Sequence, residues 1–174
     1  NEYIVAWQWV ADHVTHATVA YTGTELAYPL TGRQLTNVVR YVNIDGHPRW
    51  RLDDYDRAYR AGRFVPLTPV LASSSGELRT LPPRAGPRDD AAVPRYERLE
   101  GVRDLWIANL RRFEVTHVFV AALNAYEINY VWHNEGGFPI EDEWAKADPL
   151  AFHLIYENRQ ARLYAVSLPA TFRG

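Results

Sequence analysis

The feature that most constrains the fold is the segment 115–123 (VTHVFVAAL), in which only Thr116 and His117 are polar. A strand with one solvated face alternates apolar and polar side chains, whereas this segment is apolar on both sides. It directly follows residues 102–113, where apolar side chains recur at helical spacing. The sequence therefore predicts an amphipathic helix followed by a strand buried on both faces. The apolar stripe of that helix consists of Val102, Leu105, Trp106, Leu110 and Phe113.

The same order of elements occurs at the start of the chain. Residues 4–14 have a helical apolar pattern, and the β-prone residues 18–21 (TVAY) follow them. A further strand is expected over residues 38–44, before the turn signal Asp45-Gly46. Repeated helix–strand pairs are typical of layered α/β domains with a central sheet. The first apolar stripe consists of Ile4, Trp7, Val10, Ala11 and Val14.

The C-terminal part predicts a short helix and a hairpin. The helix is expected after Pro139, with Trp144 toward the core, and the two strands cover residues 152–158 and 161–166. We therefore predict one α/β domain over residues 1–174. It is a layered sandwich with a mixed, largely parallel central sheet, helices on its faces and a C-terminal hairpin. Residues 53–61 favour a short polar helix, and residues 66–95 a long proline-rich loop.

Composition excludes several classes of function. The formal charge is −2, so no overall positive field attracts nucleic acid, and a nucleic-acid partner is not expected. Cysteine is absent, which rules out disulfides, thiol nucleophiles and Cys-based zinc sites. No phosphate-cradling glycine loop is present, so no cofactor is expected. Methionine is absent even at the first position, which leads us to expect a fragment of a longer protein or a processed chain.

The densest polar and aromatic segment follows the buried strand and predicts a ligand site. Sugars stack their apolar C–H faces on aromatic rings, while amides and carboxylates bind their hydroxyl groups. The alternative is that these rings pack beneath the proline-rich loop. The candidate ligand-binding residues of this segment are Tyr126, Glu127, Tyr130, Trp132, His133 and Glu135.

A second group of candidates lies in the turn after the first strand. Tyr21 and Thr22 precede Gly23, and ligands of open α/β sheets gather at the carboxyl ends of strands. A lone glycine is not a dinucleotide fingerprint, however, so a plain tight turn is the simpler interpretation.

Other titratable residues have simpler interpretations than chemistry. Glu141, Asp142 and Glu143 fit the first turn of a helix, where negative charge is stabilising, better than an acid/base pair. His13 and His16 have a spacing that can present two imidazoles to a metal, but no third ligand is evident. We therefore expect no metal and assign no catalytic residue. A serine hydrolase is also not indicated, because no G-x-S-x-G motif is present.

Several short segments together resemble a known group of proteins. They include residues 17–23 (ATVAYTG), 115–120 (VTHVFV), 152–158 (FHLIYEN) and 163–166 (LYAV), with Pro139-x-Glu141-x-x-Trp144 between them. The chain is similar, over about two thirds of its length, to the C-terminal soluble region of polytopic type C glycosyltransferase-like membrane proteins, which include protein mannosyltransferase-like and arabinose-transferase-like enzymes. In that group an extracytoplasmic α/β domain often follows a membrane body.

The resemblance implies an accessory role. The catalytic acid of those enzymes lies in a loop of the membrane body, so no catalytic residue can be transferred to this chain. The leading hypothesis is a non-catalytic extracytoplasmic domain of a membrane-anchored parent, with a glycan or protein acceptor as partner. The alternatives are a free-standing enzyme acting on a sugar or nucleotide, and a structural or oligomerisation module.

Overall fold

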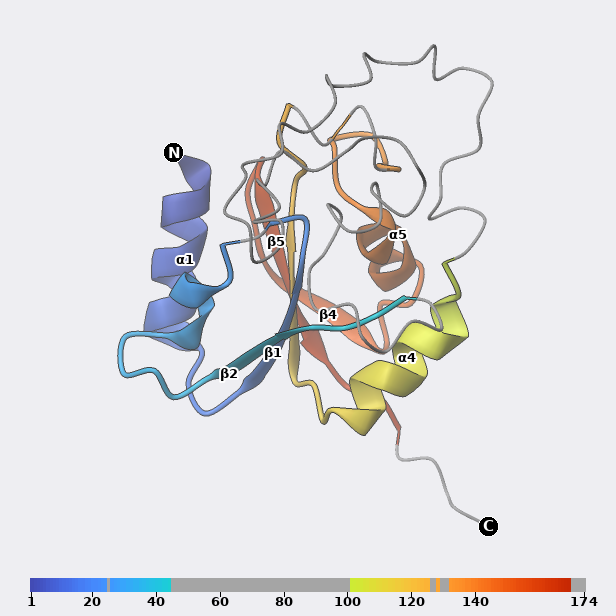
Figure 1. Cartoon of the computed structure of the whole chain (residues 1–174), viewed down its shortest axis with the longest axis horizontal. Coiled ribbons are helices and arrows are strands. Elements are labelled where there is room, and N and C mark those ends of the chain that lie inside the picture. Colours follow the sequence, from blue (N-terminus) through green and yellow to red (C-terminus); the bar gives the residue numbers. More distant parts are fainter. Residues whose placement is uncertain (25, 45–100, 126–127, 129–131, 170–174) are drawn as a thin grey trace, which may run out of the picture.

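The computed structural model describes residues 1–24, 26–44, 101–125, 128 and 132–169, which form one α/β unit (Figure 1). This agrees with the predicted fold class. The predicted helix over residues 53–61 and the proline-rich loop over 66–95 lie outside the described residues. In chain order the elements are α1 (Glu2–His13), β1 (Thr18–Thr22), the 3-10 helix η1 (Tyr28–Thr31), β2 (Val38–Tyr41), α4 (Arg103–Arg112), β3 (His117–Ala121), α5 (Ile140–Lys146), β4 (Phe152–Glu157) and β5 (Ala161–Val166).

The five strands form one mixed sheet in the order β2-β1-β3-β5-β4. β1 runs parallel to both β2 and β3, so the first three strands form a parallel half. β5 is antiparallel to β3 and forms the C-terminal hairpin with β4. The predicted mixed sheet and closing hairpin are therefore confirmed.

β3 lies at the centre of the sheet and is buried on both faces, as its sequence predicts. Val118 and Val120 belong to the apolar cluster beneath α4 and α5. Phe119 and Ala121 belong to the cluster beneath α1. Full burial of one such aliphatic or aromatic side chain stabilises a fold by about 1.5–3 kcal/mol. This one strand therefore joins the two halves of the core.

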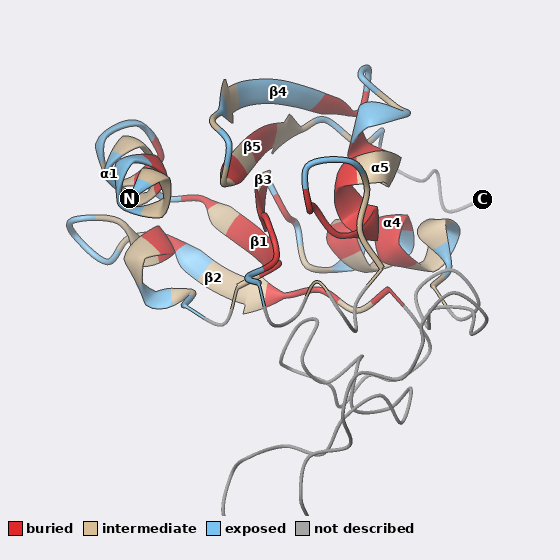
Figure 2. Ribbon diagram, turned by 90° about the horizontal axis from the view of Figure 1, so that it is seen from above, coloured by how far each residue is buried: buried red, intermediate tan, exposed pale blue. Residues whose placement is uncertain are grey.

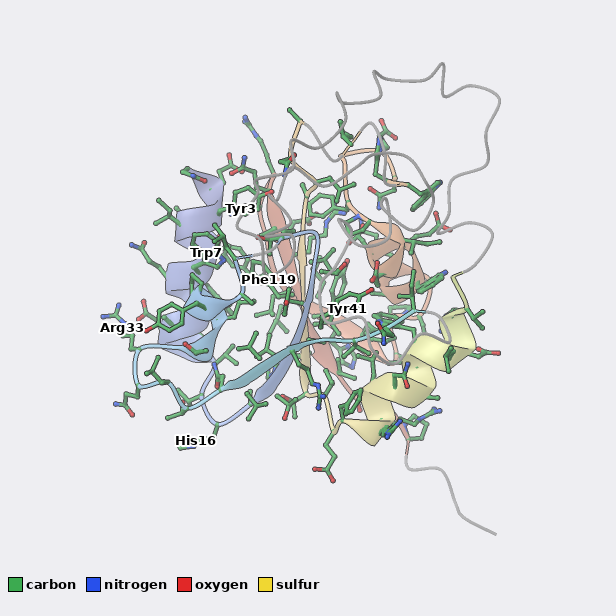
Figure 3. The ribbon with its side chains drawn as sticks, in the orientation of Figure 1. Tyr3, Trp7, His16, Arg33, Tyr41 and Phe119 are labelled. Atoms are coloured by element: carbon green, nitrogen blue, oxygen red, sulfur yellow. The ribbon has the colours of Figure 1, made fainter. Side chains whose placement is uncertain are left out.

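Helices cover the sheet on both sides (Figures 1 and 2). α1 and η1 lie on one face, where Tyr3 and Trp7 of α1 approach Phe119 of β3 (Figure 3). α4 and α5 lie on the other face, where Trp106 stacks on Phe152 with ring centroids 5.2 Å apart and Trp144 lies 5.6 Å from Trp106. Trp144 is therefore directed toward the core, as predicted.

The predicted helical stripes are wrong at two positions. Val102 is 49% exposed, because it is the extended N-cap residue of α4 and precedes the helical turns. Ile4 is 48% exposed, because α1 turns Ala6 and Val10 toward the sheet instead. α1 also starts two residues earlier than predicted, because the side chain of Asn1 accepts a hydrogen bond from the Tyr3 N–H (3.1 Å) and caps the helix.

Candidate functional site

The site is built at the carboxyl edge of the parallel strands. From β1 the chain turns toward the α1 face and forms η1, whose Leu30 packs beneath α1. From β3 the chain turns toward the opposite face and reaches α5. Two adjacent parallel strands whose outgoing connections diverge create a topological switch point, which is the usual ligand position in open α/β sheets. Thr22 and Ala121 are the last residues of these two strands.

Gly23 lets the chain pass close to β3 at this switch point. Its φ of +76° lies in the left-handed region that side chains disfavour. A Cβ atom at this position would lie 1.9 Å from the carbonyl oxygen of Ala121, so the backbones of the two strand ends are in direct contact. The glycine that the sequence marked as a turn is therefore also required for close packing of β1 against β3.

The hydroxyl group of Thr22 is buried on the α4–α5 face. Thr22 lies opposite Val120 of β3 and is only 2% exposed. Its Oγ1 has no hydrogen-bond partner in the described part of the chain. A buried hydroxyl without a partner costs stability, so it is either a defect of packing or a contact for a ligand.

This cost leads to a prediction for Thr22. We expect Thr22→Val, which has the same shape but no hydroxyl, to raise the free energy of unfolding by about 1 kcal/mol. Chemical denaturation measures the change. Thr22→Ser is the matched control, because it keeps the hydroxyl and loses a methyl group, and it should destabilise the protein. A destabilised Thr22→Val protein would show that the hydroxyl has a partner in the folded chain.

The connection between β3 and α5 is closed at its base. The N–H of Leu123, just after β3, donates to the carbonyl oxygen of Gly137 (2.8 Å). Asn134 is hydrogen-bonded to the segment that leads into α5. Its N–H donates to the Phe138 carbonyl (2.9 Å), and its Oδ1 accepts from the Phe138 N–H (3.2 Å). We call residues 124–136 the β3–α5 loop. It contains the whole polar-aromatic segment, and these hydrogen bonds close its base.

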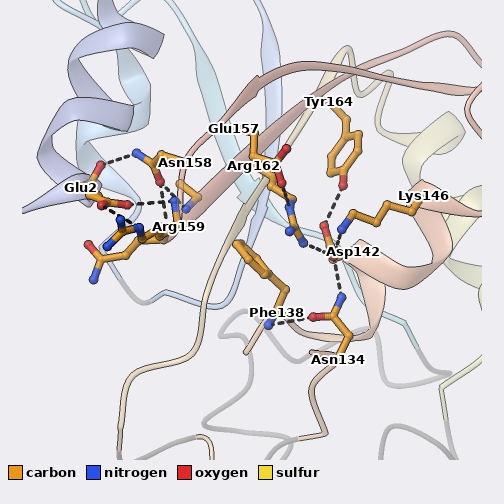
Figure 4. A network of polar contacts seen from close by, with 12 residues as sticks. Glu2, Asn134, Phe138, Asp142, Lys146, Glu157, Asn158, Arg159, Arg162 and Tyr164 are labelled. Atoms are coloured by element: carbon orange, nitrogen blue, oxygen red, sulfur yellow. Dashed lines mark hydrogen bonds and ion pairs between the residues drawn. The ribbon is translucent and has the colours of Figure 1, made fainter. Parts of the chain in front are cut away.

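Asn134 connects the end of the loop to Asp142 of α5, which is completely buried (Figure 4). Asn134 donates to Asp142 Oδ2 from its side-chain amide (2.6 Å), and Arg162 Nη1 donates to the same oxygen (2.5 Å). The hydroxyl of Tyr164 donates to Oδ1 (2.7 Å), and Lys146 Nζ lies 3.6 Å from Oδ2. A buried carboxylate requires such a set of partners.

Arg162 extends this network along β5. Its Nε donates to Glu157 of β4 (2.7 Å), and its guanidinium carbon lies 3.8 Å from the centre of the Phe138 ring. Desolvation and the hydrogen bond to Asp142 raise the pKa of Tyr164 far above its usual value. The tyrosine therefore stays protonated and keeps donating to the carboxylate.

Asp142 has a structural role and holds its hydrogen-bond partners in place. Its side chain has no exposure and both of its oxygens accept hydrogen bonds, so it does not reach a bound substrate. The prediction that these acids stabilise the first turn of a helix by capping is thus only partly right. Glu141, Asp142 and Glu143 do form the first turn of α5, but Glu141 and Asp142 are buried, and no side chain caps this helix. These two side chains are buried because the first turn of α5 packs against the sheet.

The structure divides the predicted site residues into groups. Trp132 packs partly buried against the α4–α5 cluster, His133 is half-buried with Nδ1 3.1 Å from the Asn134 carbonyl oxygen, and Glu135 is exposed. Thr22 lies on the same face of the sheet as this group, whereas Tyr21 points to the α1 face and contacts Tyr41. Tyr126, Glu127 and Tyr130 lie outside the described residues. Ligand binding by these residues stays a prediction.

Sequence reasoning missed the anchor of the site. The signal was present in β5, where Arg162 and Tyr164 alternate with the apolar Ala161 and Leu163. An arginine in a strand that is buried on both faces requires an acidic partner. The sequence contains many acids, and nothing local identifies Asp142 as that partner.

The histidine pair is placed on the surface. His13 stacks on Trp9 with ring centroids 4.3 Å apart, and both His13 and His16 are exposed. Among the described residues, no group of three or more His, Asp or Glu side chains could hold a metal ion. Across the same ranges, no helix has the length and apolar character needed to cross a membrane.

Three hollows of the described surface lie away from the β3–α5 loop. Two adjoin each other along α4, with volumes of about 420 and 410 Å³, and share Arg111, Ser167, Leu168 and Pro169. The third, of about 380 Å³, lies between α1 and η1 and includes Ile4 and Trp7.

Comparisons of this chain with protein-family models, with curated proteins and with solved structures find no match.

Proposed function

We propose that this chain is a non-catalytic recognition domain that presents the β3–α5 loop to a carbohydrate or to a protein acceptor. The observation that supports this most directly is the anchoring of the loop: hydrogen bonds close its base at Leu123 and Gly137, and a buried carboxylate holds Asn134. Because the described end of the loop is fixed in this way, Trp132, His133 and Glu135 lose less conformational entropy on binding. The hydroxyl of Thr22, which has no hydrogen-bond partner among the described residues, lies on the same face of the sheet as Trp132.

The parent protein is the second part of the proposal. The sequence resemblance supports an extracytoplasmic domain attached to a membrane glycosyltransferase-like body, in which this domain positions an acceptor for the transferase. The chemistry would then belong to the parent. The coding sequence upstream of Asn1 tests this part directly, since the proposal requires several apolar segments of about 20 residues there. Their absence would contradict the membrane parent and leave ligand recognition by the loop open.

Trp132 provides the test of recognition. We expect ligand-observed NMR with a panel of mono- and oligosaccharides to detect binding, and Trp132→Leu to weaken it about three- to tenfold, because leucine fills apolar space but offers no ring face. Trp144→Leu is the matched control: it removes a second tryptophan that packs partly buried on the same cluster, but from α5. Its affinity should equal that of the unchanged protein.

Two outcomes would contradict the carbohydrate assignment. Equal weakening by both substitutions would show a general effect on the core. The absence of any binding by the unchanged domain would move the proposal to a protein contact. That second candidate has its own observation: Ile4, Val5, Leu26 and Tyr28 are all large, exposed and apolar. Ile4 lines the hollow between α1 and η1.

A further inference from the structure

Most of the basic residues that the structure describes form ion pairs with carboxylates, and the exceptions lie in one region. Five of the eight described basic residues form ion pairs with carboxylates. The other three are Arg40, Arg111 and Arg112, and none of them has a carboxylate partner within the described ranges. The paired residues are Arg33 with Asp12, Arg103 with Asp148, Lys146 with Asp142, Arg159 with Glu2, and Arg162 with Asp142 and Glu157.

The three unpaired residues are gathered by the end of α4. Arg111 and Arg112 form its last turn, and Phe113 is its C-cap residue. Arg40 comes from β2, at the edge of the sheet, and its guanidinium carbon lies 3.4 Å from the centre of the Phe113 ring. The guanidinium carbon of Arg112 lies 5.5 Å from the same ring. We call Arg40, Arg111, Arg112 and Phe113 the arginine corner.

The helix dipole explains only part of this arrangement. Cations near the last turn of a helix are stabilised by its negative end, and guanidinium groups bind the faces of aromatic rings. Two like charges beside one ring nevertheless repel each other. In addition, the Nε atoms of Arg40 and Arg111 are buried and have no hydrogen-bond acceptor in the described chain. Neither the dipole nor the ring provides an acceptor for these N–H groups.

The carboxylate nearest in sequence does not provide one either. Glu114 follows Phe113 with a left-handed φ of +52°, and its N–H donates to the carbonyl oxygen of Arg111 (3.0 Å). Its side chain is exposed and forms no ion pair with the described arginines. The corner therefore combines three positive charges and two buried donors, with no acceptor for them among the residues that the structure describes.

We propose that the arginine corner binds a phosphate group. A guanidinium group presents planar pairs of N–H donors that match the oxygens of a phosphate, and a dianion balances more of this charge than a single carboxylate does. Arg40 and Arg112 hold the phosphate beside Phe113. Arg111 supplies a third positive charge from the same helical turn and lines a hollow of about 410 Å³ along α4, whose lining does not include Arg40, Arg112 or Phe113. The corner lies near the start of β3, at the opposite end of that strand from the β3–α5 loop, so this site is separate from the proposed recognition loop (Figure 1).

NMR of the arginine Nε–Hε groups in the whole 174-residue chain tests the proposal, with inorganic phosphate as the first probe. We expect the signals of Arg40 and Arg112 to shift on addition of phosphate, and not with chloride at the same ionic strength. Arg112→Gln should weaken phosphate binding about tenfold, because one charge-assisted contact is lost. Arg33→Gln removes an exposed arginine of the opposite face and should leave the affinity unchanged.

A second variant separates charge from geometry. Arg40→Lys keeps the positive charge but loses the planar group on Phe113, so binding should weaken while the net charge stays the same. If this variant does not fold, Arg112→Gln still decides, because Arg112 is exposed at the end of α4. Equal shifts with chloride and phosphate, or equal weakening by Arg33→Gln and Arg112→Gln, would overturn the proposal.

Further probes identify the source of the phosphate. Glucose 1-phosphate represents a sugar phosphate, and short-chain phosphatidic acid below its micelle concentration represents a lipid headgroup. Tighter binding of either than of inorganic phosphate would support the site and name its ligand class, and equal binding of all three would support free phosphate. Failure of all three to bind would overturn the proposal, whatever the result of the saccharide screen at the β3–α5 loop.

Discussion

Replacing Asp142 by asparagine is expected to lower the free energy of unfolding by about 3–5 kcal/mol, because the largely buried Arg162 loses the buried one of its two carboxylate partners. Asparagine has nearly the same shape, so the loss reports on charge and not on packing. Arg162, whose side chain is only 11% exposed, would keep Glu157 but lose its 2.5 Å contact. Urea denaturation at neutral pH measures the change.

Asp148→Asn is the matched control for this experiment. Asp148 also forms an ion pair with an arginine, Arg103 at 2.9 Å, but its side chain is 35% exposed. Ion pairs open to solvent contribute about 0–1 kcal/mol, so this variant should be nearly as stable as the unchanged protein. If Asp142→Asn were equally mild, the carboxylate would not be the anchor that its contacts indicate.

The same substitution links the fold to the proposed function. Asn134 is the residue through which Asp142 holds the β3–α5 loop. Asp142 itself does not reach the surface, so any effect of its replacement on saccharide affinity would act through the position of the loop. A loss of affinity at temperatures where Asp142→Asn is still folded would support a positioning role.

Much of the fold could be predicted because local pattern and tertiary environment agree. The segment at β3 is apolar on both sides and does lie between two clusters. The apolar periodicity predicted burial incorrectly at the end of a helix, where a residue no longer has helical backbone angles. Val102 fits the helical stripe by spacing, but as an extended cap residue it does not share the direction of the helical side chains. Periodicity gives the face of a helix but not its first residue.

The candidate sites depend on contacts that are distant in the sequence, and for this reason they could be predicted only in part. The position of the polar-aromatic segment after β3 followed from the order of elements. Its anchor did not, because Asp142 and Arg162 are 20 positions apart and a buried first-turn acid has the same sequence signature as a solvated one. The arginine corner joins Arg40 to Phe113 across an even longer separation, and neither residue belongs to a recognisable motif.

Gly23→Ala is the second substitution with a large expected effect, a loss of at least about 3 kcal/mol in the free energy of unfolding. Part of the loss comes from the left-handed backbone, with φ of +76°, which an L-residue adopts only at a cost. The larger part comes from the new Cβ, which would lie 1.9 Å from the Ala121 carbonyl oxygen. The new Cβ and the carbonyl oxygen both belong to the backbone at the strand ends. The ends of β1 and β3 must therefore move apart, next to the candidate site.

Gly137→Ala isolates the first contribution, the cost of the left-handed backbone. Gly137 has a φ of +80°, close to that of Gly23, but a Cβ there meets only the end of the Ile128 side chain at 3.5 Å, an ordinary van der Waals contact. It should therefore show only the cost of the left-handed backbone, about 1–2 kcal/mol. Denaturation of the two variants side by side gives the difference. Equal losses would mean that the ends of β1 and β3 separate at little cost, and strand ends of this kind would not hold Thr22 and the β3–α5 loop in a fixed relation to a ligand.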